Sequence, residues 1–303
     1  MNAPAPRVPH PAEQRDASRF APRIQARARF GALFQLVCLL ATLAGLLVLA
    51  VLLIDIVRTG AGRLSWDFLN QFPSRMVSRS GLKPAIYGSI FTLVVTAALA
   101  FPLGVGTAIW LEEYAPASRI KTILETNIAN LAGVPSIVYG ILGLALFVRY
   151  LAFGRSILAA SFTLALLILP VVIIASQEAI KAVPSSIRLG AYALGSTRWE
   201  AVRYHVLPLA LPGILTGTIL ALSRAIGEAA PLLLIGALAF LAFTPDSLMD
   251  PFTVVPIQIY NWVSKPQAGF HELAAAASIV LLALLLSMNA IAILLRNRYS
   301  RRN

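Results

Sequence analysis

A long apolar stretch near the N-terminus sets the class of fold that this chain can adopt. Residues 36–57 read LVCLLATLAGLLVLAVLLIDIV, with Asp55 as the single charged side chain. A helix needs about 20 apolar residues to cross a bilayer, and several further runs approach or exceed that length. With 58% hydrophobic and 13% charged residues, the chain is unsuited to a soluble fold. Continuous runs, without alternation of apolar and polar residues, predict helices and argue against a β-barrel.

The hydropathy of the chain predicts an all-α, polytopic membrane protein with six transmembrane helices. The predicted spans are residues 33–57, 86–111, 128–151, 156–177, 213–237 and 273–295. An even number of spans puts both termini on the same side of the membrane. With cytoplasmic termini, sixteen Lys and Arg residues fall on the cytoplasmic side and eight on the other. This ratio favours cytoplasmic termini, because short cytoplasmic loops are enriched in Lys and Arg.

The basic residues concentrate beside the spans and explain the net charge of +12. The preference of Lys and Arg for the cytoplasmic ends of spans and their attraction to anionic lipids account for this placement. We therefore expect membrane lipid and no nucleic acid as a partner. Residues 1–32, rich in Pro, Ala and Arg, are predicted to be a disordered basic cytoplasmic tail ahead of a membrane domain over 33–303. The single cysteine, Cys38, lies in the first predicted span, which excludes a disulfide within the chain.

The longest predicted cytoplasmic loop, residues 178–212, has a helical pattern of its own. After Pro184, either Ser185 or Ser186 is predicted to cap a short amphipathic helix, which Gly195 interrupts. The pattern leaves two interpretations open. The loop either lies on the lipid headgroups as an interfacial helix or presents an apolar helix face to a soluble partner.

A second short helix follows the glycine and carries Arg198 and Trp199. Pro208 and Pro212 are predicted to end it, since proline cannot continue the hydrogen-bond ladder of a helix. Together, the two helices and the glycine bend predict a compact cytoplasmic element.

This loop resembles the permease subunits of ABC importers. Their signature is Glu-Ala-Ala, three residues, Gly, nine residues, Ile, one residue and Leu-Pro. In YALGSTRWEAVRYHVLPLALPG, residues 192–213, the glycine falls on Gly195 and the Leu-Pro on Leu207 and Pro208. The acidic position falls on Leu189, the two alanines on Gly190 and Ala191, and the isoleucine on His205, so the acid and the isoleucine are both absent. The departures weaken any contact that requires the acid, but the spacing is retained.

Three further stretches narrow the resemblance. They are residues 108–147, beginning AIWLEEYAPASRIK, residues 223–237, SRAIGEAAPLLLIGA, and residues 256–302, beginning PIQIYNWVSKPQAG. Together with the loop, they resemble the inner-membrane permease of the phosphate-specific ABC importer, and its A-type subunit (PstA-like) more than the paired C-type subunit. The resemblance extends from about residue 33 to the C-terminus and implies the fold of an ABC type I importer permease.

The resemblance implies a larger assembly in which this chain is a transporter subunit and not an enzyme. A homologous permease subunit would pair with it, inorganic phosphate would pass between the two, and an extracytoplasmic phosphate-binding protein would deliver the phosphate. An ABC ATPase dimer would bind ATP with Mg²⁺, since this chain lacks the G-x-x-x-x-G-K-[ST] loop and is expected to bind no cofactor or metal itself.

The same resemblance makes residues 178–212 a coupling loop that docks on the ATPase. The residues expected to couple the ATPase are Leu194, Gly195, Arg198, Trp199, Leu207 and Pro208. Leu194 and Trp199 are the expected anchors, because buried aliphatic and aromatic groups dominate such contacts.

Arg224 and Glu228 are charges inside the fifth predicted span, where each costs roughly 2.5 to 3.5 kcal/mol to insert. Four residues apart on a helix, they lie on one face and can pair. For an anion transporter, we expect them to line the substrate pathway, with Arg224 attracting phosphate and Glu228 restraining it. A permanent ion pair that joins two helices is the alternative.

Other classes of function are less well supported by the residues. An enzyme is not expected, because His10, His205 and His271 are far apart in sequence and no H-E-x-x-H motif is present. A signalling anchor and an importer of sulfate, molybdate or a phosphonate remain open, since Arg224 suits any oxyanion. The loop between the fifth and sixth spans is the candidate contact of the binding protein, with a re-entrant hairpin as the alternative.

Overall fold

The computed structural model describes residues 24–237 and 240–300. It divides into two units, Met1–Asp55 and Ile56–Asn303, and helix α2 (Ile24–Gly60) crosses the boundary between them. Phe30–Arg63 is long and apolar enough to cross a membrane, which confirms the first predicted span. The predicted basic tail lies outside the described residues as far as residue 23.

The second unit, residues 56–303, is a helical bundle. Its elements, in chain order, are η1 (Ala61–Arg63), α3 (Trp66–Asn70), η2 (Val77–Arg79), α4 (Lys83–Ile109), η3 (Trp110–Tyr114), α5 (Arg119–Ala132), α6 (Ser136–Gly143), η4 (Leu144–Tyr150), α7 (Ile157–Lys181), α8 (Ser185–Ala193), α9 (Arg198–Ala201), η5 (Val202–Val206), α10 (Leu207–Ile226), α11 (Ala230–Ile235), α12 (Val255–Val263) and α13 (Ala268–Ser300). Segments η3, η4 and η5 are π-helical. In the described part of the chain, β-structure is limited to one isolated bridge between Ser156 and Pro251.

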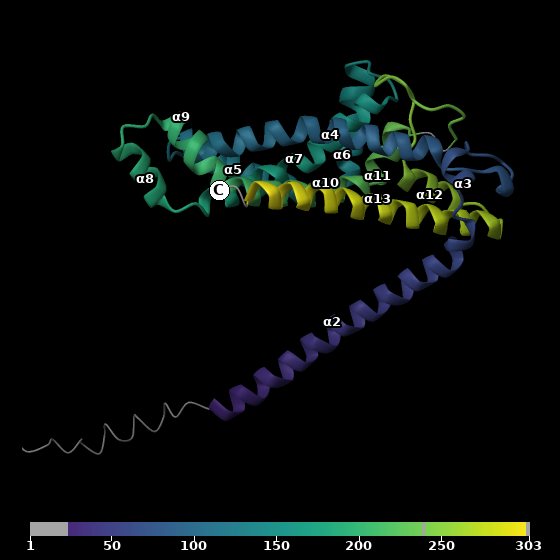
Figure 1. Cartoon of the computed structure of the whole chain (residues 1–303), viewed down its shortest axis with the longest axis horizontal. Helices are drawn as coiled ribbons and strands as arrows, with labels where there is room; N and C mark the ends of the chain where they lie inside the picture. Colours follow the sequence, from purple (N-terminus) through teal and green to yellow (C-terminus); the bar gives the residue numbers. More distant parts are fainter. Residues whose placement is uncertain (1–23, 238–239, 301–303) are drawn as a thin grey trace, which may run out of the picture. The chain divides into compact units, whose positions relative to one another are not determined.

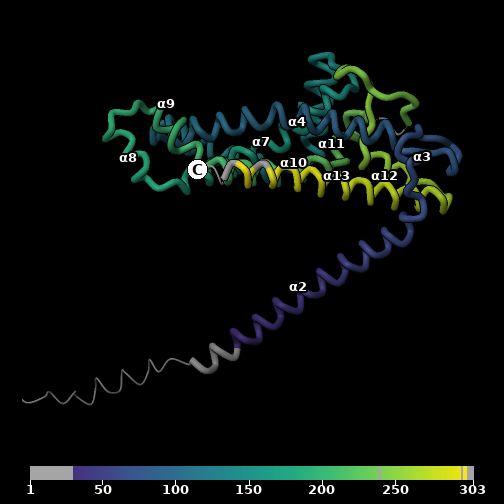
Figure 2. The backbone as a smooth tube through the Cα atoms, viewed as in Figure 1, coloured from purple at the N-terminus to yellow at the C-terminus, as the bar shows by residue number. Residues whose placement is uncertain are grey.

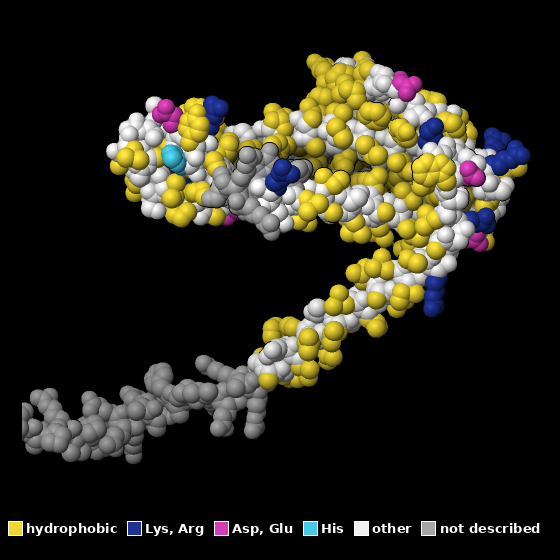
Figure 3. Space-filling model, in the orientation of Figure 1, with side chains coloured by type: hydrophobic (Ala, Val, Ile, Leu, Met, Phe, Trp, Pro, Cys, Tyr) yellow, Lys and Arg dark blue, Asp and Glu magenta, His cyan; other side chains and the backbone are white. Residues whose placement is uncertain are grey.

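Helices α4, α7, α10 and α13 run along the bundle, with α7 packed against both α4 and α10 (Figure 1). Helices α8 and α9 lie at one end, here called the loop end, and α3 and α12 lie at the other, the α12 end. The backbone trace shows α4 running from the α12 end to the loop end (Figure 2). On the face drawn in Figure 3, hydrophobic side chains cover most of the middle of the bundle, and charged side chains lie mainly toward its ends.

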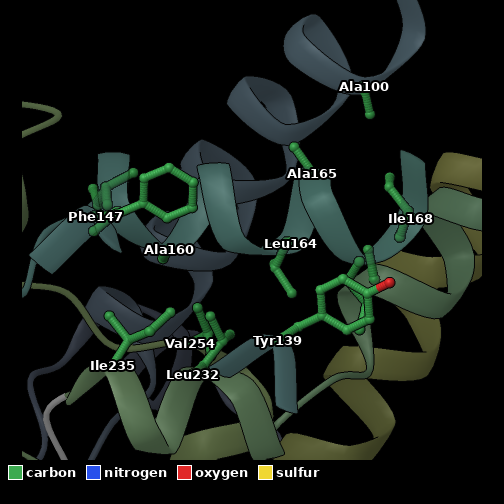
Figure 4. Packing of buried hydrophobic residues seen from close by; sticks show 14 of the residues in the cluster. Ala100, Tyr139, Phe147, Ala160, Leu164, Ala165, Ile168, Leu232, Ile235 and Val254 are labelled. Carbon is green, nitrogen blue, oxygen red and sulfur yellow. The ribbon is translucent and has the colours of Figure 1, made fainter. Parts of the chain in front are cut away.

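Helix α7 is the centre of the main core cluster. Its Leu164 and Ile168 pack with Tyr139 of α6 and Leu232 of α11 (Figure 4). A second cluster at the α12 end includes Trp262, and a third lies beneath the coupling loop at the loop end. Because α7 is surrounded by other helices, it is apolar around most of its circumference, as its continuous hydropathy predicts.

The glycine pair in α10 allows the close approach of α7. A Cβ added at Gly213 would lie 2.8 Å from the Cβ of Ala179, and one at Gly217 would collide with Ala175. Small residues four positions apart therefore bring the two backbones together, in the way that G-x-x-x-G pairs favour contact between membrane helices.

The second, fourth and sixth predicted spans are confirmed, because Lys83–Tyr114, Ile157–Lys181 and Ala268–Arg298 are helices of sufficient length and hydropathy. The third predicted span, 128–151, is broken within its length and is not one continuous helix. Arg119–Ala132 and Ser136–Tyr150 meet at a bend of 100°. Gly133 ends the first helix, and Pro135 cannot donate a hydrogen bond across the break.

The fifth predicted span, 213–237, differs from the structure at both ends. One helix runs from Arg198 to Ile226 through α9, η5 and α10, so Pro208 and Pro212 do not end the second short helix of the loop. The π-helical η5 directly precedes Pro208, so the hydrogen-bond ladder already departs from the α-helical pattern where the N–H of the proline is missing. At the other end, the helix breaks between α10 and α11, before residue 230.

Candidate functional site

Arg224 and Glu228 flank the break between α10 and α11. The Nε of Arg224 lies 3.3 Å from Oε1 of Glu228, so the predicted ion pair forms, although across the end of a helix and not along one. The Arg224 side chain is 50% exposed and that of Glu228 is 17% exposed. The cation is therefore the accessible member of the pair. Among the described residues, its Nη1 and Nη2 groups have no hydrogen-bond partner.

The break has a local cause in the sequence. The N–H of Gly227 donates to the carbonyl of Arg224 at 3.2 Å, and the N–H of Glu228 donates to that of Ala225 at 3.2 Å, which closes the last turn of α10. Pro231 then occupies the first turn of α11, where a proline needs no donor. The charged pair thus sits beside a short stretch of non-helical backbone.

Helix α6 packs directly against this break. A Cβ added at Gly140 would lie 2.6 Å from the Cα of Pro231, so only glycine admits the contact. Nearby, the hydroxyl of Tyr139 donates to the carbonyl of Leu131 at 2.9 Å and joins α6 to α5. The side-chain amide of Asn127 donates to the carbonyl of Ile123 of its own helix at 2.8 Å.

The coupling loop contains the predicted glycine bend. Gly195 has φ +84°, a left-handed conformation that favours glycine, and it separates α8 from α9. The predicted serine cap of α8 is wrong, since Pro184 holds the N-cap position without a side-chain bond. The cap lies at the second helix instead, where Thr197 and Glu200 exchange hydrogen bonds in a capping box.

The structure brings four of the predicted coupling residues together at the bend. Leu194 is 87% exposed and Trp199 is 53% exposed, so both side chains are accessible beside Gly195. The guanidinium of Arg198 lies 5.2 Å from the ring centre of Tyr114. Leu207 and Pro208 are instead half-buried in the first turn of α10, where Leu207 packs against the core cluster beneath the loop.

A buried ion pair that the sequence does not reveal anchors the coupling loop. Arg188 of α8 donates through Nη2 and Nε to Oε1 of Glu113, at 2.7 and 2.9 Å. It also donates to the backbone carbonyls of Ile180 and Val183, at 3.0 and 2.8 Å. Glu113, which belongs to η3, is 5% exposed. The loop is therefore held to the ends of both α4 and α7.

A second polar cluster lies at the same end of the bundle. Gln177 of α7 donates to Glu112 at 2.8 Å and to Glu125 of α5 at 3.4 Å, and Lys181 lies 3.6 Å from Glu112. Of the residues that the structure describes, no three His, Cys, Asp or Glu side chains are grouped so as to hold a metal ion. The carboxylates at this end therefore serve hydrogen bonds and ion pairs between helices.

A family model described as "Binding-protein-dependent transport system inner membrane component" matches residues 100–302. The chain belongs to this family. The match includes both the coupling loop and the Arg224–Glu228 pair. As a family member, the chain is a multi-pass, inner-membrane permease subunit of the ABC importer type and not an enzyme.

Individual relatives agree with the family match. The probable ABC transporter permease protein YqgI of Bacillus subtilis is 31% identical over 232 residues, which cover 74% of this chain and 79% of the relative. The phosphate transport system permease protein PstA 1 of Mycobacterium tuberculosis is 34% identical over 223 residues, covering 73% of this chain and 72% of the relative.

Solved structures share the fold of this permease at low sequence identity. A bacterial ABC transporter involved in the import of the polysaccharide alginate matches with a TM-score of 0.65 and 14% identity, over 91% of this chain and 99% of its own. The MetNI methionine ABC transporter in an inward-facing conformation matches with a TM-score of 0.59 and 17% identity, over 71% of this chain and 96% of its own. The expected fold of an ABC type I importer permease is thus confirmed.

Proposed function

We propose that this permease conducts inorganic phosphate as the A-type subunit of a phosphate-specific ABC importer. Several relatives at 29% to 39% identity are named phosphate transport system permease proteins, from Mycobacterium, Xylella and Haemophilus. The observation that carries the proposal is the exposed guanidinium of Arg224 beside a helix break. Such a group is a fork of donors that matches the geometry of a phosphate oxygen pair.

In this proposal, Arg224 attracts phosphate and Glu228 restrains it. Only Nε of Arg224 is used by Glu228, so phosphate can take the two Nη groups without first breaking the ion pair. Glu228 lowers the cost of holding the cation in the membrane when no phosphate is present. Its negative charge also weakens phosphate binding, which favours release.

The assembly in this proposal has a homologous permease subunit, an ABC ATPase dimer and an extracytoplasmic phosphate-binding protein. The ATPase carries ATP with Mg²⁺ and docks on the coupling loop, with Leu194 and Trp199 entering its groove. Both termini of the permease lie in the cytoplasm. ATP-driven closure of the ATPase then displaces the loop and, through it, the α10 helix that carries Arg224.

The first test is uptake of radiolabelled phosphate in cells that lack only this subunit, with the wild-type chain or a variant restored. We expect Arg224→Ala to lower uptake about tenfold or more, since a hydrogen bond to a charged group is worth about 1.5 to 3 kcal/mol. Arg224→Lys should retain part of the uptake, because it keeps the charge but not the fork.

Arg149→Ala is the matched control, since Arg149 is an exposed arginine of η4 and its loss changes the net charge equally. Wild-type uptake by an assembled Arg224→Ala complex would show that the ion pair only joins helices. Uptake of labelled phosphate that excess sulfate, molybdate or phosphonate abolishes would point to another oxyanion. A chain that assembles but restores no uptake would favour a signalling role.

A further inference from the structure

A cavity of about 500 Å³ lies at the α12 end of the bundle, apart from the Arg224–Glu228 pair. One wall comes from the segment between α3 and η2, and the other comes from α12 and the turn that follows it. Its polar lining consists of Ser74, Arg75, Gln258, Asn261, Trp262 and Lys265. The volume falls within the range of small-molecule sites in proteins.

Two polar atoms of this lining are buried without a partner. Gln258 is 1% exposed and Trp262 is fully buried, yet Oε1 of Gln258 and Nε1 of Trp262 make no hydrogen bond within the described chain. Buried polar groups are nearly always paired, and an unpaired one costs about 1 to 3 kcal/mol. Both atoms are closed to solvent, so they lie behind the cavity wall, and the polar side chains that a bound molecule can reach are those of Ser74, Arg75, Asn261 and Lys265.

The charge of the side chains that line the cavity indicates which kind of molecule it binds. Arg75 and Lys265 are the charged members, and no Asp or Glu lines the cavity in the part of the chain that the structure describes. The Nζ of Lys265 lies 3.8 Å from the ring centre of Phe270, which holds the ammonium group in place. Burial lowers the pKa of Lys265, and an anion in the cavity would offset that effect by favouring the charged form.

We propose that this cavity binds a phosphate oxyanion, with Arg75 and Lys265 supplying the charge and Ser74 and Asn261 supplying hydrogen-bond donors. The oxyanion is either free inorganic phosphate or the phosphate of a lipid headgroup, because both present the same oxygens. The site is distinct from the pathway pair and goes beyond the proposed function, since binding here requires no transport.

The test is equilibrium binding of radiolabelled inorganic phosphate to the purified, assembled complex, without ATP or binding protein. All variants carry Arg224→Ala, which removes the pathway site. Arg75→Gln with Lys265→Gln should weaken binding about tenfold or more, because two charged donors are lost. Arg58→Gln with Arg79→Gln is the control, since both arginines are exposed and lie outside the lining, and it should leave binding within about twofold.

A second arm separates the two sources of phosphate. The same complexes are reconstituted in phosphatidylglycerol nanodiscs, and native mass spectrometry then counts the phospholipid retained after detergent extraction. If the site variant loses binding of free phosphate, the ligand of the cavity is inorganic phosphate. If it instead loses a retained phospholipid, the ligand is a lipid headgroup. If the site variant and the control bind both alike, the cavity is not an oxyanion site. None of these results depends on uptake, so the transport proposal stands or fails separately.

Discussion

At the scale of single residues, two ion pairs of the bundle differ in how much they contribute to the stability of the fold. Arg188 and Glu113 have side chains 20% and 6% exposed, and Arg188 also binds two backbone carbonyls. Arg63 and Glu272 are at a similar distance, 2.8 Å, but both are 41% exposed. Water screens the second pair, so it contributes about 1 kcal/mol or less.

We predict that Arg188→Gln destabilises the assembled complex by about 3 kcal/mol or more, because Glu113 is left buried without its cation. Adding Glu113→Gln should restore part of that loss, since the unpaired charge is then removed. The measurement is the thermal unfolding midpoint, with Arg63→Gln as the control of small effect. The phosphate transported per ATP should also fall in Arg188→Gln, as the loop loses its attachment to α4. Equal midpoints for Arg188→Gln and Arg63→Gln would contradict the prediction.

At the scale of elements, the two glycines of the coupling loop have opposite roles. Gly195 has φ +84° with no atom within 4 Å of an added Cβ, so a substitution there meets backbone strain and not a clash. Gly190 also has open space around it but lies inside α8 with a helical backbone.

Gly195→Ala should therefore destabilise the complex by about 1 to 2 kcal/mol, and Gly195→Asn by less, since Asn tolerates the left-handed conformation. Gly190→Ala should stabilise α8 by about 0.5 to 1 kcal/mol. Thermal unfolding and the ratio of phosphate transport to ATP hydrolysis are measured for each. A bulky residue such as Gly195→Val should uncouple hydrolysis from transport, and unchanged coupling in that variant would show that the bend is not required.

Hydropathy predicted the elements well wherever a single unbroken helix is long enough to span the membrane, as in α4, α7 and α13. It did not locate the breaks within the third and fifth spans, because hydropathy is insensitive to a bend such as the one at Gly133 and Pro135. The Arg224–Glu228 pair was predictable from its spacing. The Glu113–Arg188 pair was not, since 75 residues separate its members and only the packed ends of α4 and α8 bring them together.

At the scale of the whole molecule, the orientation in the membrane can be tested with two glycines at opposite ends of the bundle. Gly62 and Gly190 are exposed, and an added side chain at either meets nothing within 4 Å. In a Cys38→Ser background, Gly62→Cys should react with a membrane-impermeant maleimide in intact cells, whereas Gly190→Cys should react only after permeabilisation. The reverse pattern would place the termini outside, against the Lys and Arg distribution.

The continuous helix from Arg198 to Ile226 makes the proposed docking anchor, Trp199, and the proposed pathway cation, Arg224, parts of one rod. Trp199 stands at one end of it and Arg224 at the other, with glycines at 195 and 227 just beyond. A tilt of about 5° at the Trp199 end would carry the guanidinium roughly 3 Å, because a helix rises about 1.5 Å per residue. In the proposed assembly, a small rotation of Trp199 in the ATPase groove would therefore move Arg224 by about the length of a hydrogen bond, with the helix as a lever arm.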